Sequence, residues 1–131
     1  MFGAYNKRIK DNRTANDWLT KDTKIVDEYL SDPKCSYKFT ANAYIGFLNV
    51  IKYDIDKKNI AKTPDKLPVL FASGLEDPVG DYGKGVKKAF KMYTKYVDNV
   101  ELYLYEDYRS EENTSELQSH HDLVCRLLLE K

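Results

Sequence analysis

The chain has 131 residues, of which 42% are hydrophobic and 32% are charged, a balance typical of one small folded domain. Its 21 basic and 21 acidic residues cancel, and no dense run of lysine or arginine occurs, which argues against nucleic acid as a partner. No apolar stretch approaches the roughly 18 residues of a membrane span, and MFGAYNKRIK lacks the apolar core of a signal peptide. We therefore expect a cytoplasmic protein.

The first half of the chain carries two helical patterns. Apolar positions between Thr14 and Leu30 recur in clusters and predict one or two short helices, which Pro33 then stops. Thr40 can cap a further helix whose apolar residues cover more than half of its circumference. Such a helix needs to be covered on more than one side. The lysine-rich residues 52–66 are expected to form a polar connection.

In the second half of the chain the spacing of the apolar residues changes. Residues 67–73 (LPVLFAS) form a continuous apolar run, as in strands buried on both faces. Apolar residues from Val86 to Val97 recur at helical spacing, and residues 100–105 (VELYLY) alternate like a strand. Strand, helix and strand in this order predict a parallel unit, which normally sits inside a larger sheet. Because two strands cannot supply that sheet, the fold class is α/β with an incomplete sheet.

The residue pattern of 109–131 (RSEENTSELQSHHDLVCRLLLEK) differs from that of the rest of the chain. These residues resemble a common DNA sequencing-library adapter translated in one frame, so we predict a non-native tail that is not part of the fold. On this interpretation His120, His121 and Cys125 carry no chemistry. The alternative is a natural amphipathic helix, with one apolar face formed by Leu117, Val124, Leu127 and Leu128.

The loop after the first predicted strand is the most informative segment. Its sequence SGLEDPVG, residues 73–80, places carboxylates just past the carboxyl end of a strand, where open α/β sheets build ligand crevices. An Asp-Pro turn in which Asp77 accepts backbone N–H bonds explains the same residues without catalysis. The residues by themselves leave both interpretations open.

A family resemblance covers residues 2–109. The stretch LPVLFASGLEDPVGDYGKGVKKAFKMY, followed by VELYLYEDYR, resembles the C-terminal part of α/β-hydrolases of the lysophospholipase and monoacylglycerol lipase type, grouped with serine aminopeptidase-like hydrolases. The segments YNKRIKDNRTANDWLTKD and DEYLSDPKCSYKFT resemble the cap of the same group. The resemblance implies a helical cap and connection over residues 1–66 and the final strand–helix–strand of the core over 67–108, with the tail at 109–131.

The resemblance also implies a Ser-His-Asp triad of which one member is present. In the family the motif Gly-x-x-Asp-Pro-Val-Gly holds the acid, which here is Asp77, with Glu76 and Asp81 as neighbours only. The Gly-x-Ser-x-Gly elbow of the nucleophile does not occur in this chain. The family's histidine stands in an Arg-His-Glu loop, and Ser110 takes its place after Arg109. Because serine needs the histidine as its base, we expect the isolated chain to be inactive.

By the same resemblance, the parent enzyme cleaves a carboxylic ester of a single-chain lipid, either a lysophospholipid or a monoacylglycerol, and needs no metal or organic cofactor. An aminopeptidase or haloperoxidase-like hydrolase of the same fold and a non-catalytic binding module are the alternatives. We expect Lys52, Lys57 and Lys58 to form a solvated face, with transient contact to an anionic membrane surface as the second option. Packing of the core, or else an acyl-chain channel, is expected for Trp18, Leu19, Tyr44, Phe47, Leu48 and Ile51.

Overall fold

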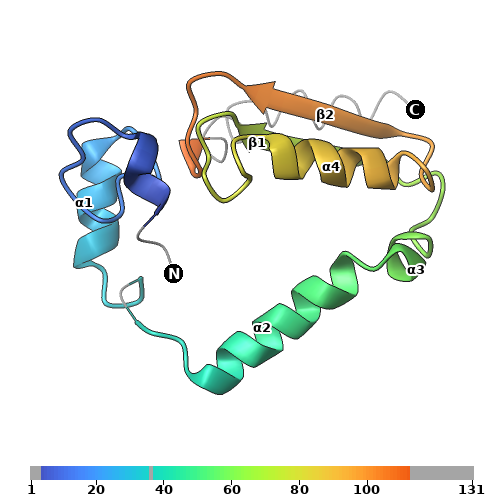
Figure 1. Cartoon of the computed structure of the whole chain (residues 1–131), viewed down its shortest axis with the longest axis horizontal. Helices are drawn as coiled ribbons and strands as arrows, with labels where there is room; N and C mark the ends of the chain where they lie inside the picture. Colours follow the sequence, from blue (N-terminus) through green and yellow to red (C-terminus); the bar gives the residue numbers. More distant parts are fainter. Residues whose placement is uncertain (1–3, 36, 113–131) are drawn as a thin grey trace.

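The computed structural model describes residues 4–35 and 37–112 (Figure 1). The elements in chain order are η1 (Tyr5–Arg8), α1 (Thr23–Ser31), α2 (Ala41–Asp54), α3 (Lys57–Ile60), β1 (Val69–Gly74), α4 (Lys84–Tyr93) and β2 (Val100–Tyr105). In Figure 1, η1 and α1 lie on one side of the molecule and the β1–α4–β2 unit on the other, with α2 and α3 as the arm that links them. Every helix in the described part of the chain is too short or too polar to cross a membrane.

The β1–α4–β2 unit confirms the predicted parallel strand–helix–strand. The two strands pair in parallel, in a register that runs from Val69 opposite Val100 to Gly74 opposite Tyr105. The crossover helix α4 packs against both strands, and Phe71 of β1 meets Tyr93 edge to face, with ring centroids 5.2 Å apart. Only two strands pair among the described residues, so the sheet is an incomplete α/β sheet.

The N-terminal part contains one short α-helix, in agreement with the one or two that the spacing predicts. Within the stretch from Thr14 to Leu30 the structure has one α-helix, α1, which begins only at Thr23. The preceding residues form turns, because the Asp17 carboxylate accepts hydrogen bonds from the backbone N–H groups of Arg13 and Thr14, at 2.5 and 3.1 Å. Such side-chain bonds offer the backbone an alternative to helix.

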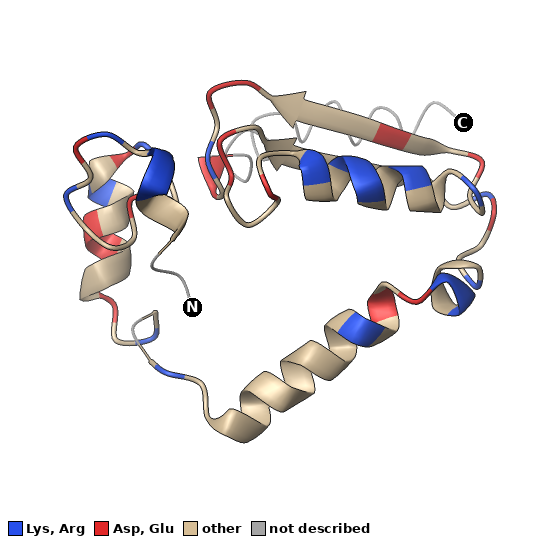
Figure 2. Ribbon diagram, viewed as in Figure 1, with Lys and Arg blue, Asp and Glu red and all other residues tan. Residues whose placement is uncertain are grey.

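Helix α2 begins where the sequence predicts. The Thr40 hydroxyl accepts a hydrogen bond from the N–H of Ala43 at 3.2 Å. No side chain of α2 is buried, and its apolar residues Phe47, Leu48 and Ile51 are exposed, so they do not pack a core in the described part of the chain. In Figure 2 the ribbon of α2 carries no Lys, Arg, Asp or Glu colour until its C-terminal end.

The connection after α2 is mostly exposed, as its lysine-rich sequence predicts. It contains the short helix α3, whose start is capped by the Asp56 carboxylate bound to the N–H of Lys58 at 2.8 Å. Ile60 at the end of α3 is only 2% exposed, and α3 packs against α4. Helix α3, with Ile60, therefore anchors the arm to the strand–helix–strand unit.

Candidate active site

Asp77 lies three residues beyond β1 and is 9% exposed. Its Oδ1 accepts a hydrogen bond from the N–H of Val79 at 2.9 Å, and its carbonyl accepts one from the N–H of Tyr82 at 2.9 Å. The turn that the Asp-Pro sequence favours is therefore present. Among residues 4–35 and 37–112, no donor is hydrogen-bonded to the other carboxylate oxygen, Oδ2. The turn thus fixes the carboxylate through one oxygen and leaves the second for another donor.

The loop after β2 is docked on the end of β1. The N–H of Glu76 donates to the carbonyl of Tyr108 at 2.9 Å, and the N–H of Leu75 donates to the carbonyl of Tyr105 at 2.8 Å. A Cβ atom added at Gly74 would lie 2.1 Å from the carbonyl oxygen of Tyr108, so only glycine permits this approach. Since the carboxyl ends of parallel strands meet at one edge, Ser110 and Asp77 belong to neighbouring loops.

Arg109 ties this edge of the sheet to the N-terminal part. Its Nη1 donates to the carbonyls of Asp17 and Thr20, at 2.7 and 3.1 Å. Two residues further on, the N–H of Glu111 donates to the carbonyl of Leu19 at 2.8 Å, a backbone bond that any residue except proline can make. These contacts hold the N-terminal part against the loops at the ends of both strands.

The proposed tail is described only in its first residues. Glu112 accepts hydrogen bonds from the N–H groups of Lys21 and Arg109, at 2.6 and 2.5 Å. The adapter interpretation assigns these residues no chemistry, and here they only add to the contact that Arg109 makes. Most of the tail, with His120, His121 and Cys125, lies outside the described residues.

Asp17, whose carbonyl accepts a hydrogen bond from Arg109, is 8% exposed. Burial by itself raises the pKa of this carboxyl group. Hydrogen bonds from the hydroxyl and N–H of Thr14 and from the N–H of Arg13, together with the Arg13 charge, outweigh burial, so the pKa lies below its ordinary value. The ionised carboxylate thus stabilises the turn whose carbonyls receive the Arg109 guanidinium.

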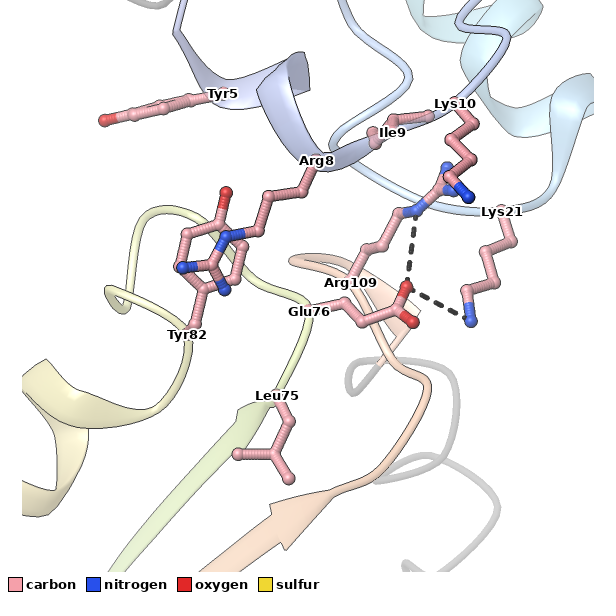
Figure 3. Close-up of a pocket in the computed structure, with 9 residues that line it drawn as sticks. All are labelled: Tyr5, Arg8, Ile9, Lys10, Lys21, Leu75, Glu76, Tyr82 and Arg109. Carbon is pink, nitrogen blue, oxygen red and sulfur yellow. Dashed lines mark ion pairs between the residues drawn. The ribbon is translucent and has the colours of Figure 1, made fainter.

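A cavity of about 410 Å³ opens between the N-terminal part and the loop after β1 (Figure 3). The Glu76 carboxylate lies in it, with Oε2 3.2 Å from Lys21 Nζ and 3.8 Å from Arg109 Nε. Sequence reasoning treated Glu76 only as a neighbour of Asp77. No local pattern reveals the cavity, because its walls come from three segments that are far apart in the sequence. They are formed by Tyr5, Arg8, Ile9, Lys10, Lys21, Leu75, Glu76, Tyr82 and Arg109.

The described residues form no cluster of metal-ligating side chains. Within the described ranges, no group of three or more His, Cys, Asp or Glu side chains could hold a metal ion. Cys35 is a free, partly exposed thiol. The chemistry that the described residues can support is therefore that of an oriented carboxylate beside a positively charged cavity.

Comparison with known proteins shows the family and the fold of this chain. Residues 1–109 match the family model described as serine aminopeptidase, S33. A highly thermostable carboxyl esterase from Bacillus coagulans, solved in complex with glycerol, has a similar fold, with a TM-score of 0.79 and 24% identity, over 98% of this chain and 43% of the esterase. A lipase solved in its open form is similar with a TM-score of 0.71 and 28% identity, over 95% of this chain and 42% of the lipase.

This chain thus spans less than half the length of those two proteins. No curated protein matches it.

Proposed function

Because the chain belongs to the serine aminopeptidase S33 family of α/β-hydrolases, we propose that it is the acid-bearing, C-terminal part of a serine hydrolase that cleaves carboxylic esters of single-chain lipids. The placement of Asp77 carries the proposal. This buried carboxylate follows β1, is fixed through Oδ1, and neighbours the loop that contains Ser110. The similarity of the fold to an esterase and a lipase supports ester chemistry.

In the complete hydrolase, by which we mean residues 1–109 joined to the remaining elements of the fold, Asp77 acts through a histidine. The nucleophilic serine attacks the ester carbonyl, and the histidine takes the serine proton and passes it to the leaving alcohol. Asp77 Oδ2 accepts the imidazole N–H, which fixes the tautomer and stabilises the imidazolium. Water then attacks the acyl-enzyme and releases the fatty acid.

The charge around the site favours an ester over the N-terminus of a peptide. An aminopeptidase binds a protonated α-amine, for which the site would supply carboxylates. The cavity beside Asp77 instead has Arg8, Lys10, Lys21 and Arg109 in its walls and a single carboxylate. Like charges brought together in a partly enclosed site repel, so this cavity disfavours an amine. The cytoplasmic location and the contact with a membrane surface stay predictions.

Paired substitutions in the loop after β1 test the proposal. In the complete hydrolase, Asp77→Asn removes the carboxylate that orients the histidine, and we expect kcat for a short-chain ester to fall by about 10³-fold to 10⁴-fold. Asp81→Asn is the matched control: Asp81 is exposed in the same loop with φ 49°, a conformation that asparagine also tolerates. Equal rates for the two variants would overturn the assignment of Asp77.

The 131-residue chain provides the second arm of the same experiment. It has neither the serine elbow nor a histidine before residue 120, so the pure chain should release no product above the buffer rate. Burst kinetics followed by turnover from this chain would mean that the catalytic groups lie elsewhere.

A further inference from the structure

The cationic side chains of the cavity fall into two classes. Lys21 and Arg109 already have partners: both pair with the Glu76 carboxylate, and Arg109 also donates to two backbone carbonyls. Within the described part of the chain, the side chains of Arg8 and Lys10 make neither an ion pair nor a hydrogen bond. Two positive charges of the wall are therefore uncompensated.

Arg8 is held in place by an aromatic ring. Its guanidinium carbon lies 3.5 Å from the centroid of the Tyr82 ring, and Figure 3 shows the guanidinium stacked over that ring. A stacked guanidinium keeps its N–H groups in the plane parallel to the ring, where they can donate to an oxyanion in bidentate fashion. Arg8 thus presents an oriented anion-binding group rather than a freely moving charge.

The loops that follow β1 and β2 line the cavity, and the same two loops contain Asp77 and the position of the family's histidine. Glu76 in the cavity wall directly precedes Asp77, and Arg109 directly precedes Ser110. A group bound there lies beside the catalytic edge of the sheet. The volume of about 410 Å³ falls in the range of small-molecule sites.

From these observations we propose that the cavity binds the head-group phosphate of the substrate, which is then a lysophospholipid rather than a monoacylglycerol. This inference rests on the proposed ester hydrolase. Phosphate offers several strong acceptor oxygens to Arg8 and Lys10, whereas a monoacylglycerol carries no charge for them to bind. Glu76 opposes the anion, and its pairing with Lys21 and Arg109 offsets that repulsion.

Direct binding tests the site without catalysis. Glycerol 3-phosphate serves as the soluble head-group probe, with inorganic phosphate, acetate and glycerol as comparison ligands, each titrated into the 131-residue chain by calorimetry. Fluorescence gives a second readout, because Trp18 is the single tryptophan and the centroid of its ring lies 5.0 Å from that of the Tyr5 ring in the cavity wall. We expect saturable binding of glycerol 3-phosphate that weakens as salt is added, and no binding of glycerol.

Matched variants locate the binding. The double substitution Arg8→Gln with Lys10→Gln should raise the Kd for glycerol 3-phosphate by about tenfold or more, and Lys10→Gln alone by a smaller factor. Lys91→Gln, on an exposed position of α4 away from the cavity, should leave the Kd unchanged. An absence of saturable binding, or an unchanged Kd in the double variant, would overturn the site. Tighter binding of inorganic phosphate or acetate than of glycerol 3-phosphate would overturn its assignment to a lipid head group.

The complete hydrolase separates this inference from the proposed function. The double variant should lower kcat/KM for a lysophospholipid by about tenfold while leaving kcat/KM for a monoacylglycerol unchanged. A hydrolase that loses both activities in Asp77→Asn, yet shows no change in preference in the double variant, keeps the proposed function and refutes the phosphate site. Phosphate binding in a protein whose ester hydrolysis does not depend on Asp77 refutes the function and keeps the site.

Discussion

Helix α2 and the loop after β1 are both specified by local sequence, yet only the loop contains a buried side chain, that of Asp77. Thr40 caps α2 as its sequence predicts, but none of the side chains of α2 is buried. In the loop, Asp77 is 9% exposed, and Ser73 near the end of β1 is 3% exposed, because Gly74 lets the chain after β2 dock there. The difference teaches that short-range signals suffice to form an element, whereas a site requires a partner from a distant part of the chain.

The largest expected effect is on the docked loop. Gly74→Ala would drive its Cβ to within 2.1 Å of the Tyr108 carbonyl oxygen, a backbone atom that cannot rotate away. We expect the free energy of unfolding to fall by about 3 kcal/mol in urea titrations followed by circular dichroism. Gly46→Ala in α2 is the control: nothing lies within 4 Å of the added methyl group, so helix stability should rise by about 0.5–1 kcal/mol. A change in the free energy of unfolding with the same sign for both substitutions would contradict the comparison.

The turn beneath Arg109 should respond to pH. Asp17→Asn removes the charge that Arg13 and Thr14 stabilise, and we expect a loss of about 2 kcal/mol at pH 7. Because the pKa is lower in the folded chain, the stabilisation is present above the unfolded pKa near 3.8 and is lost as the pH falls through the folded pKa. The difference in stability between the parent chain and the variant should therefore start to shrink below pH 3.8 and disappear once the pH is below the folded pKa.

Asp27→Asn is the control for that experiment. The Asp27 carboxylate pairs with Arg13 at 3.0 Å, but both side chains are about half exposed. Such surface pairs contribute at most about 1 kcal/mol, so the loss should be smaller than for Asp17→Asn and should shrink at high salt. An equal loss for both variants would mean that the turn does not depend on the buried carboxylate.

The sequence predicted the parts of the fold that short-range physics controls. Periodicity located the two strands and α4, and a hydroxyl at the right offset located the start of α2. Of the one or two short helices predicted between Thr14 and Leu30 the structure has one, because hydrogen bonds to the Asp17 carboxylate hold the preceding residues in turns. At the site, Asp77 was predicted through a family motif. The cavity was not, since Arg8 and Tyr82 are far apart in sequence and meet only in the folded chain.

A smaller effect is expected from removing the cap of α2. Thr40→Ala deletes the bond to the Ala43 N–H and should cost the helix about 1 kcal/mol, seen as lower helicity by circular dichroism. Because α2 packs on little else in the described chain, binding of glycerol 3-phosphate should be unchanged. A weaker affinity in this variant would show that the arm and the cavity are coupled.

The smallest effect on stability is expected from charging the exposed face of α2. Ile45 and Leu48 are 58% and 52% exposed, so replacing both with lysine should change the free energy of unfolding by less than about 0.5 kcal/mol. Removing two exposed apolar side chains should raise the monomer fraction of the 131-residue chain in light scattering. A loss of several kcal/mol would mean that α2 is packed within this chain.

Hydrogen exchange of α2 tests the central claim, that this chain is one part of a larger hydrolase, most directly. The amides of Ala41–Asp54 are compared between the 131-residue chain and the complete hydrolase under the same conditions. If the rest of the fold covers the apolar helix, these amides exchange at least about tenfold more slowly in the complete protein. Equal exchange rates in the two proteins would contradict the account.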